Sequence, residues 1–153
     1  MPKRVLSSIL IGGLIGGFFD ITYAIVFSYI RAKVPPTRLL QSVASGLLGP
    51  AAFDGGTPTA ALGLALHFFI ALVAATVYVL ASQRLPILIR EPLWCGLAYG
   101  AGIYAFMNLI VLPLSRTAPR TAFPPIVIIT GLIVHMFLIG LPIAFAARRA
   151  YVD

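Results

Sequence analysis

Four long runs of apolar residues, separated by shorter polar segments, dominate the chain. The runs cover about residues 5–30, 59–81, 92–114 and 126–147. Each is long enough to cross the hydrocarbon core of a bilayer as an α-helix, which takes about 20 residues. None shows the two-residue alternation of a lipid-exposed barrel strand. The pattern predicts one all-α integral membrane domain over residues 1–153, a four-helix bundle built from two hairpins that runs up-down-up-down.

The first connection carries a short helix of a different kind. Between Arg31 and Thr59 the chain becomes polar and rich in proline and glycine. Within Arg38 to Leu48, leucine and valine side chains fall on one side of a helix, and arginine, glutamine and serine side chains fall on the other. Such an amphipathic helix lies at the membrane surface or in the mouth of a bundle. We therefore expect one surface helix here and no β-sheet.

Small residues form stripes on the first and third apolar runs. Gly13 and Gly17 are one helical turn apart, as are Gly96 and Gly100. Small residues at this spacing allow a neighbouring helix to approach closely, so both stripes should face protein rather than lipid. Asp20 falls beside the first stripe. We expect Asp20 to face the same interface, within reach of His67 or Tyr104 directly or through water, rather than to point at lipid.

The second and fourth runs each contain a histidine preceded by a glycine one turn earlier. The segments are GLALHFF at residues 63–69 and GLIVHMF at residues 131–137. Together with the two glycine stripes, they make the halves of the chain alike. Because each half forms an in-out-in hairpin, the likeness predicts a parallel internal repeat, with its axis along the membrane normal. His67 and His135 are then equivalent positions.

Polar side chains from all four runs fall at similar depths when residues are counted from the middle of each run. An ionisable group near the bilayer centre is costly and usually has a partner or a function. The sequence therefore predicts a polar layer inside the domain. Its members are Asp20, His67, Tyr104, Asn108 and His135.

Three interpretations of the histidines remain open. In the first, each neutral imidazole bonds a backbone carbonyl or a neighbouring side chain and only ties helices together. In the second, Asp20 and a histidine share a proton in a site that binds a small solute or responds to protons. In the third, His67 and His135 are the axial ligands of a b-type haem, with the nearby glycines leaving room for the macrocycle. We expect no cofactor, with haem b as the alternative.

Composition and charge agree with a membrane protein. Apolar residues make up 60% of the chain, and the mean hydropathy is +1.02. The net charge of +7 does not indicate nucleic-acid binding, because the eleven lysines and arginines are scattered at the ends of the apolar runs, where headgroups would meet them. Six of them lie on the side of the termini and five on the other, a weak bias that predicts cytoplasmic termini.

Catalytic and metal-binding motifs are missing from the sequence. It has no nucleophile and base at motif spacing, no phosphate loop, and no paired histidines at metal-site spacing. We therefore predict neither an enzyme nor a metal site. The glycine stripes suit another class of function, in which the protein is a homo-oligomer or an accessory subunit that binds the spans of a partner membrane protein.

From Thr59 to Arg149 the chain resembles the YagU-like family of bacterial inner-membrane proteins. The resemblance is carried by His67, Tyr78, Arg84-Leu85-Pro86, Trp94, Gly96, Pro113-Leu114, His135 and Arg148-Arg149. It implies a helical multi-pass protein of the bacterial inner membrane and no particular reaction. Asp20 lies outside the resemblance, so its role is argued from this sequence alone.

Overall fold

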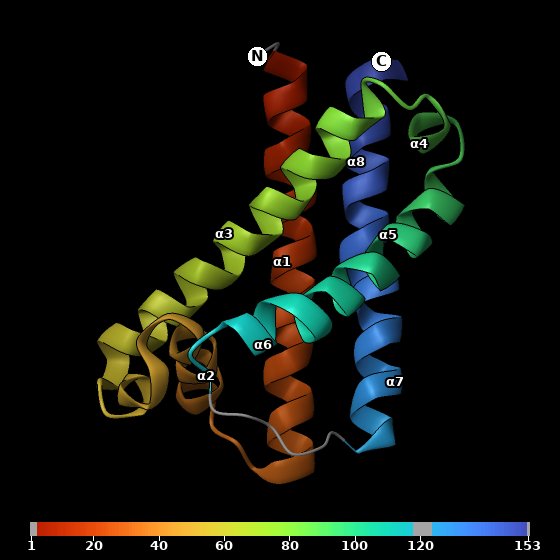
Figure 1. Ribbon diagram of the computed structural model, residues 1–153. Coiled ribbons are helices and arrows are strands. Elements are labelled where there is room, and N and C mark those ends of the chain that lie inside the picture. Colours follow the sequence, from red (N-terminus) through yellow and green to blue (C-terminus); the bar gives the residue numbers. More distant parts are fainter. Residues whose placement is uncertain (1–2, 118–123, 153) are drawn as a thin grey trace.

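The computed structural model describes residues 3–117 and 124–152, and it is helical throughout this part of the chain (Figure 1). Among these residues, the helices long and apolar enough to cross a membrane are Lys3–Ala32, Gly56–Ser82, Pro92–Leu114 and Pro125–Tyr151. They contain the four predicted runs. The all-helical class and the four long apolar helices are thus confirmed. The middle of the third connection, residues 118–123, lies outside the described residues.

The first two long helices are continuous, and the last two are divided. The elements are α1 (Lys3–Ala32), α2 (Pro36–Leu48), the 3₁₀ helix η1 (Gly49–Phe53), α3 (Gly56–Ser82), α4 (Ile87–Arg90), α5 (Pro92–Phe106), the π-helix η2 (Met107–Val111), α6 (Leu112–Leu114), α7 (Pro125–Val134), the π-helix η3 (His135–Gly140) and α8 (Leu141–Val152). The third helix is therefore α5–η2–α6, and the fourth is α7–η3–α8.

The long helices cross one another at oblique angles. In Figure 1, α1 and the fourth helix stand side by side, while α3 and the third helix run diagonally in front of them. The main packing partners of α1 are α3 and α8, and those of α5 are η3 and α8. Both ends of the described chain lie at the same end of the molecule. The arrangement departs from the near-parallel packing of a regular four-helix bundle.

The glycines of α1 bring two different helices close to it. Gly13 and Gly17 lie against α3, where a Cβ on Gly17 would come within 3.1 Å of the Ala71 methyl group. The neighbouring glycines Gly12 and Gly16 lie against the fourth helix instead. Because glycine has no side chain, both partners pack directly on the α1 backbone. The segment GGLIGG therefore serves two interfaces.

The glycines of the third helix likewise allow close contact, here with the fourth helix. A Cβ on Gly100 would overlap the carbonyl group of His135, and a Cβ on Gly140 would overlap the carbonyl oxygen of Gly96. At these points the two backbones are in contact, and no other residue type fits without moving a helix. The predicted stripes of Gly96 and Gly100 thus lie inside the molecule.

Both π-helical segments precede a proline by two residues. Pro113 and Pro142 have no N–H to bond the carbonyl groups of Leu109 and Leu138, which lie within η2 and η3. A π-helical turn rearranges the backbone bonds around such a gap, and π-helical turns are common at functional sites. Here η3 begins at His135 and η2 precedes the end of the third helix.

The predicted short helix is α2, and its polar side faces inward. Gln41 and Ser45 are buried, and the Gln41 amide donates a hydrogen bond to the Gly56 carbonyl oxygen at 3.0 Å. Leu47, in contrast, is 54% exposed. A Cβ on Gly63 would overlap the Leu40 carbonyl, so α2 packs closely on α3. This polarity is the reverse of that in a water-soluble protein and is expected where the surroundings are apolar.

Candidate functional site

A cavity of about 310 Å³ separates α3 from the third helix. Its wall is mainly apolar, with contributions from α1, α2, α3, the third helix and η3. The polar residues that line it are Asp20, Ser42, His67, Ser115, Thr117 and His135. The two histidines and the aspartate of the predicted polar layer therefore share one cavity. Tyr104 and Asn108 take other positions, described below.

Asp20 pairs with His135 at the inner wall of this cavity. Their closest atoms, Asp20 Oδ1 and His135 Nδ1, are 3.7 Å apart, and the two side chains are only 12% and 20% exposed. At 3.7 Å the two groups are too far apart for a hydrogen bond, and they attract each other as an ion pair when the imidazole is protonated. This contact joins α1 to the fourth helix.

The partner of Asp20 differs from the expected His67 or Tyr104, and helix geometry explains why. At about 100° per residue, Asp20 lies about 40° around α1 from Gly16 and about 60° from Gly17. Gly16 packs on the fourth helix, whereas Gly17 packs on α3. Asp20 therefore follows Gly12 and Gly16 towards His135. The expectation placed it with the glycines that face α3.

His67 reaches the same cavity from α3 and is held by backbone. Its Nε2 is 2.9 Å from the carbonyl oxygen of Gly17, and its ring meets Phe68 edge to face. The contact exists because Gly17 brings the two helices together, as the sequence predicts for this glycine stripe. This hydrogen bond fits the interpretation in which an imidazole ties two helices together.

Tyr104 and Asn108 support the site from the third helix. The Tyr104 ring packs edge to face on His135, with centroids 5.2 Å apart, and it occupies the space beside Gly131, where a Cβ would come within 2.8 Å. The Asn108 amide donates to the Tyr104 carbonyl oxygen at 2.8 Å. Tyr104 thus positions the His135 ring, while Asn108 completes the backbone bonding at η2.

The two hydrogen bonds assign opposite tautomers to the histidines. A carbonyl oxygen only accepts hydrogen bonds, so the ring nitrogen that faces it must carry the hydrogen. His67 donates from Nε2 to Gly17, and His135 donates from Nδ1 to the Gly131 carbonyl at 2.9 Å. In their neutral forms, His67 Nδ1 and His135 Nε2 are left as acceptors.

These assignments can be checked by ¹⁵N NMR of the imidazole rings. With two histidines in the chain, the variant His135→Gln assigns both sets of signals. We expect the neutral His67 ring to be protonated at Nε2 and the neutral His135 ring at Nδ1, because each hydrogen is held by a carbonyl. Spectra showing the same tautomer for both rings would contradict the geometry.

The histidine geometry does not fit the haem alternative. His67 uses Nε2 for the Gly17 carbonyl, so an iron would have to approach Nδ1, the ring nitrogen next to the carbon that bears Cβ. Groups of three histidine, cysteine, aspartate or glutamate side chains, which would suit a metal ion bound without a macrocycle, do not occur within residues 3–117 and 124–152.

Tyr99 of α5 bonds α3 next to a residue of the cavity wall. Its hydroxyl group donates to the Ala74 carbonyl oxygen at 2.7 Å, and its ring meets the buried Tyr78 ring with centroids 4.9 Å apart. Ala74 itself lines the cavity. Tyr99 therefore stands between α3 and α5 as a spacer, bonded to the wall residue Ala74.

Comparison of the two halves shows what Tyr99 replaces. When Gly13 and Gly17 are aligned with Gly96 and Gly100, Tyr99 falls at the position of Gly16. In the first half this glycine allows α1 to touch the fourth helix. A tyrosine at the matching place keeps the third helix away from α3. The sequence does contain a signal for this difference between the halves. The segment GGLIGG has a glycine at position 16, whereas the aligned position in the second half is Tyr99.

The chain matches no protein-family model, and neither the curated proteins nor the solved structures include a significant match. The resemblance to the YagU-like family therefore stays a prediction. What the chain does has to be argued from the cavity and its polar groups.

Proposed function

We propose that this chain is a multi-pass membrane protein that binds a small solute in the cavity between α3 and the third helix, and that it does so in a proton-dependent way. The observation that carries the proposal is the Asp20–His135 pair at the wall of an otherwise apolar cavity. His67 adds a second ionisable group to the same wall. We propose a binding protein rather than an enzyme.

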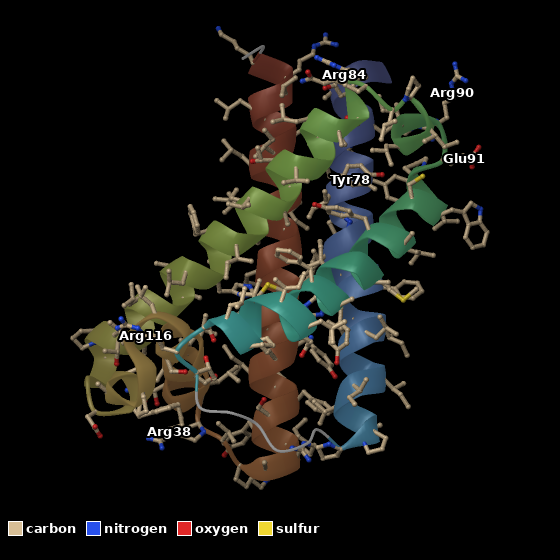
Figure 2. The ribbon with its side chains drawn as sticks, in the orientation of Figure 1. Arg38, Tyr78, Arg84, Arg90, Glu91 and Arg116 are labelled. Atoms are coloured by element: carbon tan, nitrogen blue, oxygen red, sulfur yellow. The ribbon has the colours of Figure 1, made fainter. Side chains whose placement is uncertain are left out.

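The distribution of apolar and charged side chains supports insertion into a membrane. Large apolar side chains such as Phe69, Trp94 and Leu109 are 63%, 68% and 74% exposed, which is costly in water and favourable in lipid. Figure 2 shows Arg84 and Arg90 at the end that holds the termini, and Arg38 and Arg116 towards the opposite end. The molecule thus has an apolar belt between two basic ends.

The proposed location is the bacterial inner membrane with both termini in the cytoplasm. Arg148 and Arg149 directly follow the fourth apolar run, where a cytoplasmic headgroup layer would meet them. The resemblance to the YagU-like family points to the same membrane.

An ionisable group at this depth costs free energy, so its presence suggests that it serves a function. A carboxylate at the centre of a spanning helix costs about 2.5–3.5 kcal/mol on insertion scales. Asp20 lies beside a cavity rather than within a tightly packed interface, and it has an imidazole partner. Intramembrane groups in such positions commonly bind ions, solutes or protons. A purely structural tie would not need a cavity beside it.

The glycine stripes give less support to the alternative of an accessory subunit or a homo-oligomer. Gly13 and Gly17 are covered by α3, and Gly96 and Gly100 by the fourth helix of the same chain. The surfaces proposed to receive another protein are therefore already filled. Purification as part of a larger membrane complex would favour that alternative.

Solute binding can be tested with three probes that share one phenylethyl-sized frame but differ in charge: 2-phenylethylammonium, 2-phenylethanol and phenylacetate. The purified protein in neutral detergent is melted at increasing probe concentration. A ligand of the folded state raises the melting temperature saturably. We expect at least one probe to do so, and its effect to shrink in Asp20→Asn.

Asp54→Asn is the matched control, because it removes one carboxylate from an exposed turn and changes the net charge equally. It should respond to the probes like the parent. Solute binding in the cavity is wrong if no probe acts saturably on the parent. The role of Asp20 in binding is wrong if a charged probe acts saturably and affects the parent and Asp20→Asn equally.

A further inference from the structure

The ionisable groups of the cavity have no hydrogen left to offer a ligand. The hydrogen of each neutral imidazole is taken by a carbonyl, that of His67 by Gly17 and that of His135 by Gly131. A carboxylate such as Asp20 carries lone pairs only. In the neutral-imidazole state, these three side chains present acceptors alone.

The hydroxyl groups of the cavity wall are in the same situation. Ser42 donates to the Leu39 carbonyl at 2.6 Å, and Ser115 donates to the Leu112 carbonyl at 2.8 Å. The remaining hydroxyl group of the wall, that of Thr117, is accounted for through Ser45. Ser45 donates to the Ser42 carbonyl at 2.7 Å, so in its 3.5 Å contact with Thr117 the threonine is the donor.

No lysine or arginine lines the cavity within the described part of the chain. The wall therefore combines a carboxylate and several lone pairs with an apolar surface, and it has no counter-charge for an anion. Such a wall suits a ligand that supplies positive charge, hydrogen-bond donors and an apolar body. An anion or a molecule with acceptors only would leave the wall groups unpaired.

We propose that the solute is a small organic ammonium ion with an apolar body, held by Asp20 with His67 and His135. This inference rests on the proposed function and names the class of its solute. An engineered apolar cavity of about 150 Å³ holds benzene, so about 310 Å³ leaves room for roughly twice that number of heavy atoms. The ammonium group lies at Asp20, and the apolar body lies between α3 and the third helix.

The ammonium ion competes with protons for this site. A proton on Asp20, His67 or His135 removes a lone pair and adds positive charge to the wall. The other titratable group packed against these three is Tyr104, whose ring lies on His135. Binding of the ammonium ion therefore weakens as the pH falls, and each bound cation takes the place of a proton when the site was protonated beforehand.

Equilibrium dialysis of the three phenylethyl-sized probes against the parent protein tests the ligand class without any variant. We expect 2-phenylethylammonium to bind at least about tenfold more tightly than 2-phenylethanol, and phenylacetate not to bind saturably. Asp20→Asn should weaken the ammonium ion at least about tenfold and leave 2-phenylethanol within twofold. Asp54→Asn should change neither affinity.

The possible results separate the ligand class from the binding function. Saturable binding of phenylacetate or 2-phenylethanol that equals or exceeds that of the ammonium ion overturns the class and leaves solute binding intact. Tighter ammonium binding at lower pH also overturns the class. Absence of saturable binding by all three probes overturns both proposals.

Discussion

Gly100→Ala should destabilise the protein by at least about 1–3 kcal/mol, the cost of overpacking a close contact. The added methyl group would overlap the carbonyl of His135. Neither group can move alone, because the methyl group is attached directly to the α5 backbone and the His135 carbonyl is part of the η3 backbone. The third and fourth helices would have to separate at the residue that pairs with Asp20. We therefore expect a lower melting temperature and weaker solute binding together.

Gly102→Ala is the matched control, two residues away on the same helix. A Cβ at Gly102 would meet no atom within 4 Å. Alanine is also the better helix former, by roughly 0.5–1 kcal/mol in a helix interior. This variant should melt at or above the temperature of the parent in the same detergent. If Gly100→Ala melts like Gly102→Ala, the close contact between α5 and η3 is wrong.

Tyr99→Ala should remove the spacer that holds the cavity open. Loss of a large aromatic side chain costs about 3–5 kcal/mol at a buried site, and we expect the low end of that range because Tyr99 is half-buried. With the side chain gone, α5 can approach α3, because a small residue such as the introduced alanine allows close packing of two helices. Saturable stabilisation by the solute probes should then disappear.

Tyr99→Phe distinguishes the spacer from its hydrogen bond. It keeps the ring against Tyr78 and removes only the bond to the Ala74 carbonyl, which is worth about 1 kcal/mol. We expect this variant to melt slightly below the parent and to bind the probes like the parent. Unchanged probe binding in Tyr99→Ala would show that the cavity does not depend on this residue.

Much of the architecture could be read from local patterns. The lengths and apolarity of the four runs predicted four long helices because backbone groups in an apolar medium must bond within their own segment. The side chains of α2 likewise separated into two faces by helical periodicity alone. Which face points inward depended on what surrounds the helix, and the structure turns Gln41 and Ser45 towards α3.

The sequence by itself determined the helices, the glycine stripes and the approximate levels of Asp20, His67 and His135 along their own helices, since these follow from spacing along one chain segment. Only the tertiary structure decided which helices meet. Asp20 stands between two glycine faces of α1, and packing on the fourth helix gives it His135 as its partner. The cavity, too, arises from contacts between distant segments, because Tyr99 keeps α5 from α3 where glycine lets α1 touch the fourth helix. Spacing within one helix cannot reveal such contacts, since they depend on the shapes of both partners.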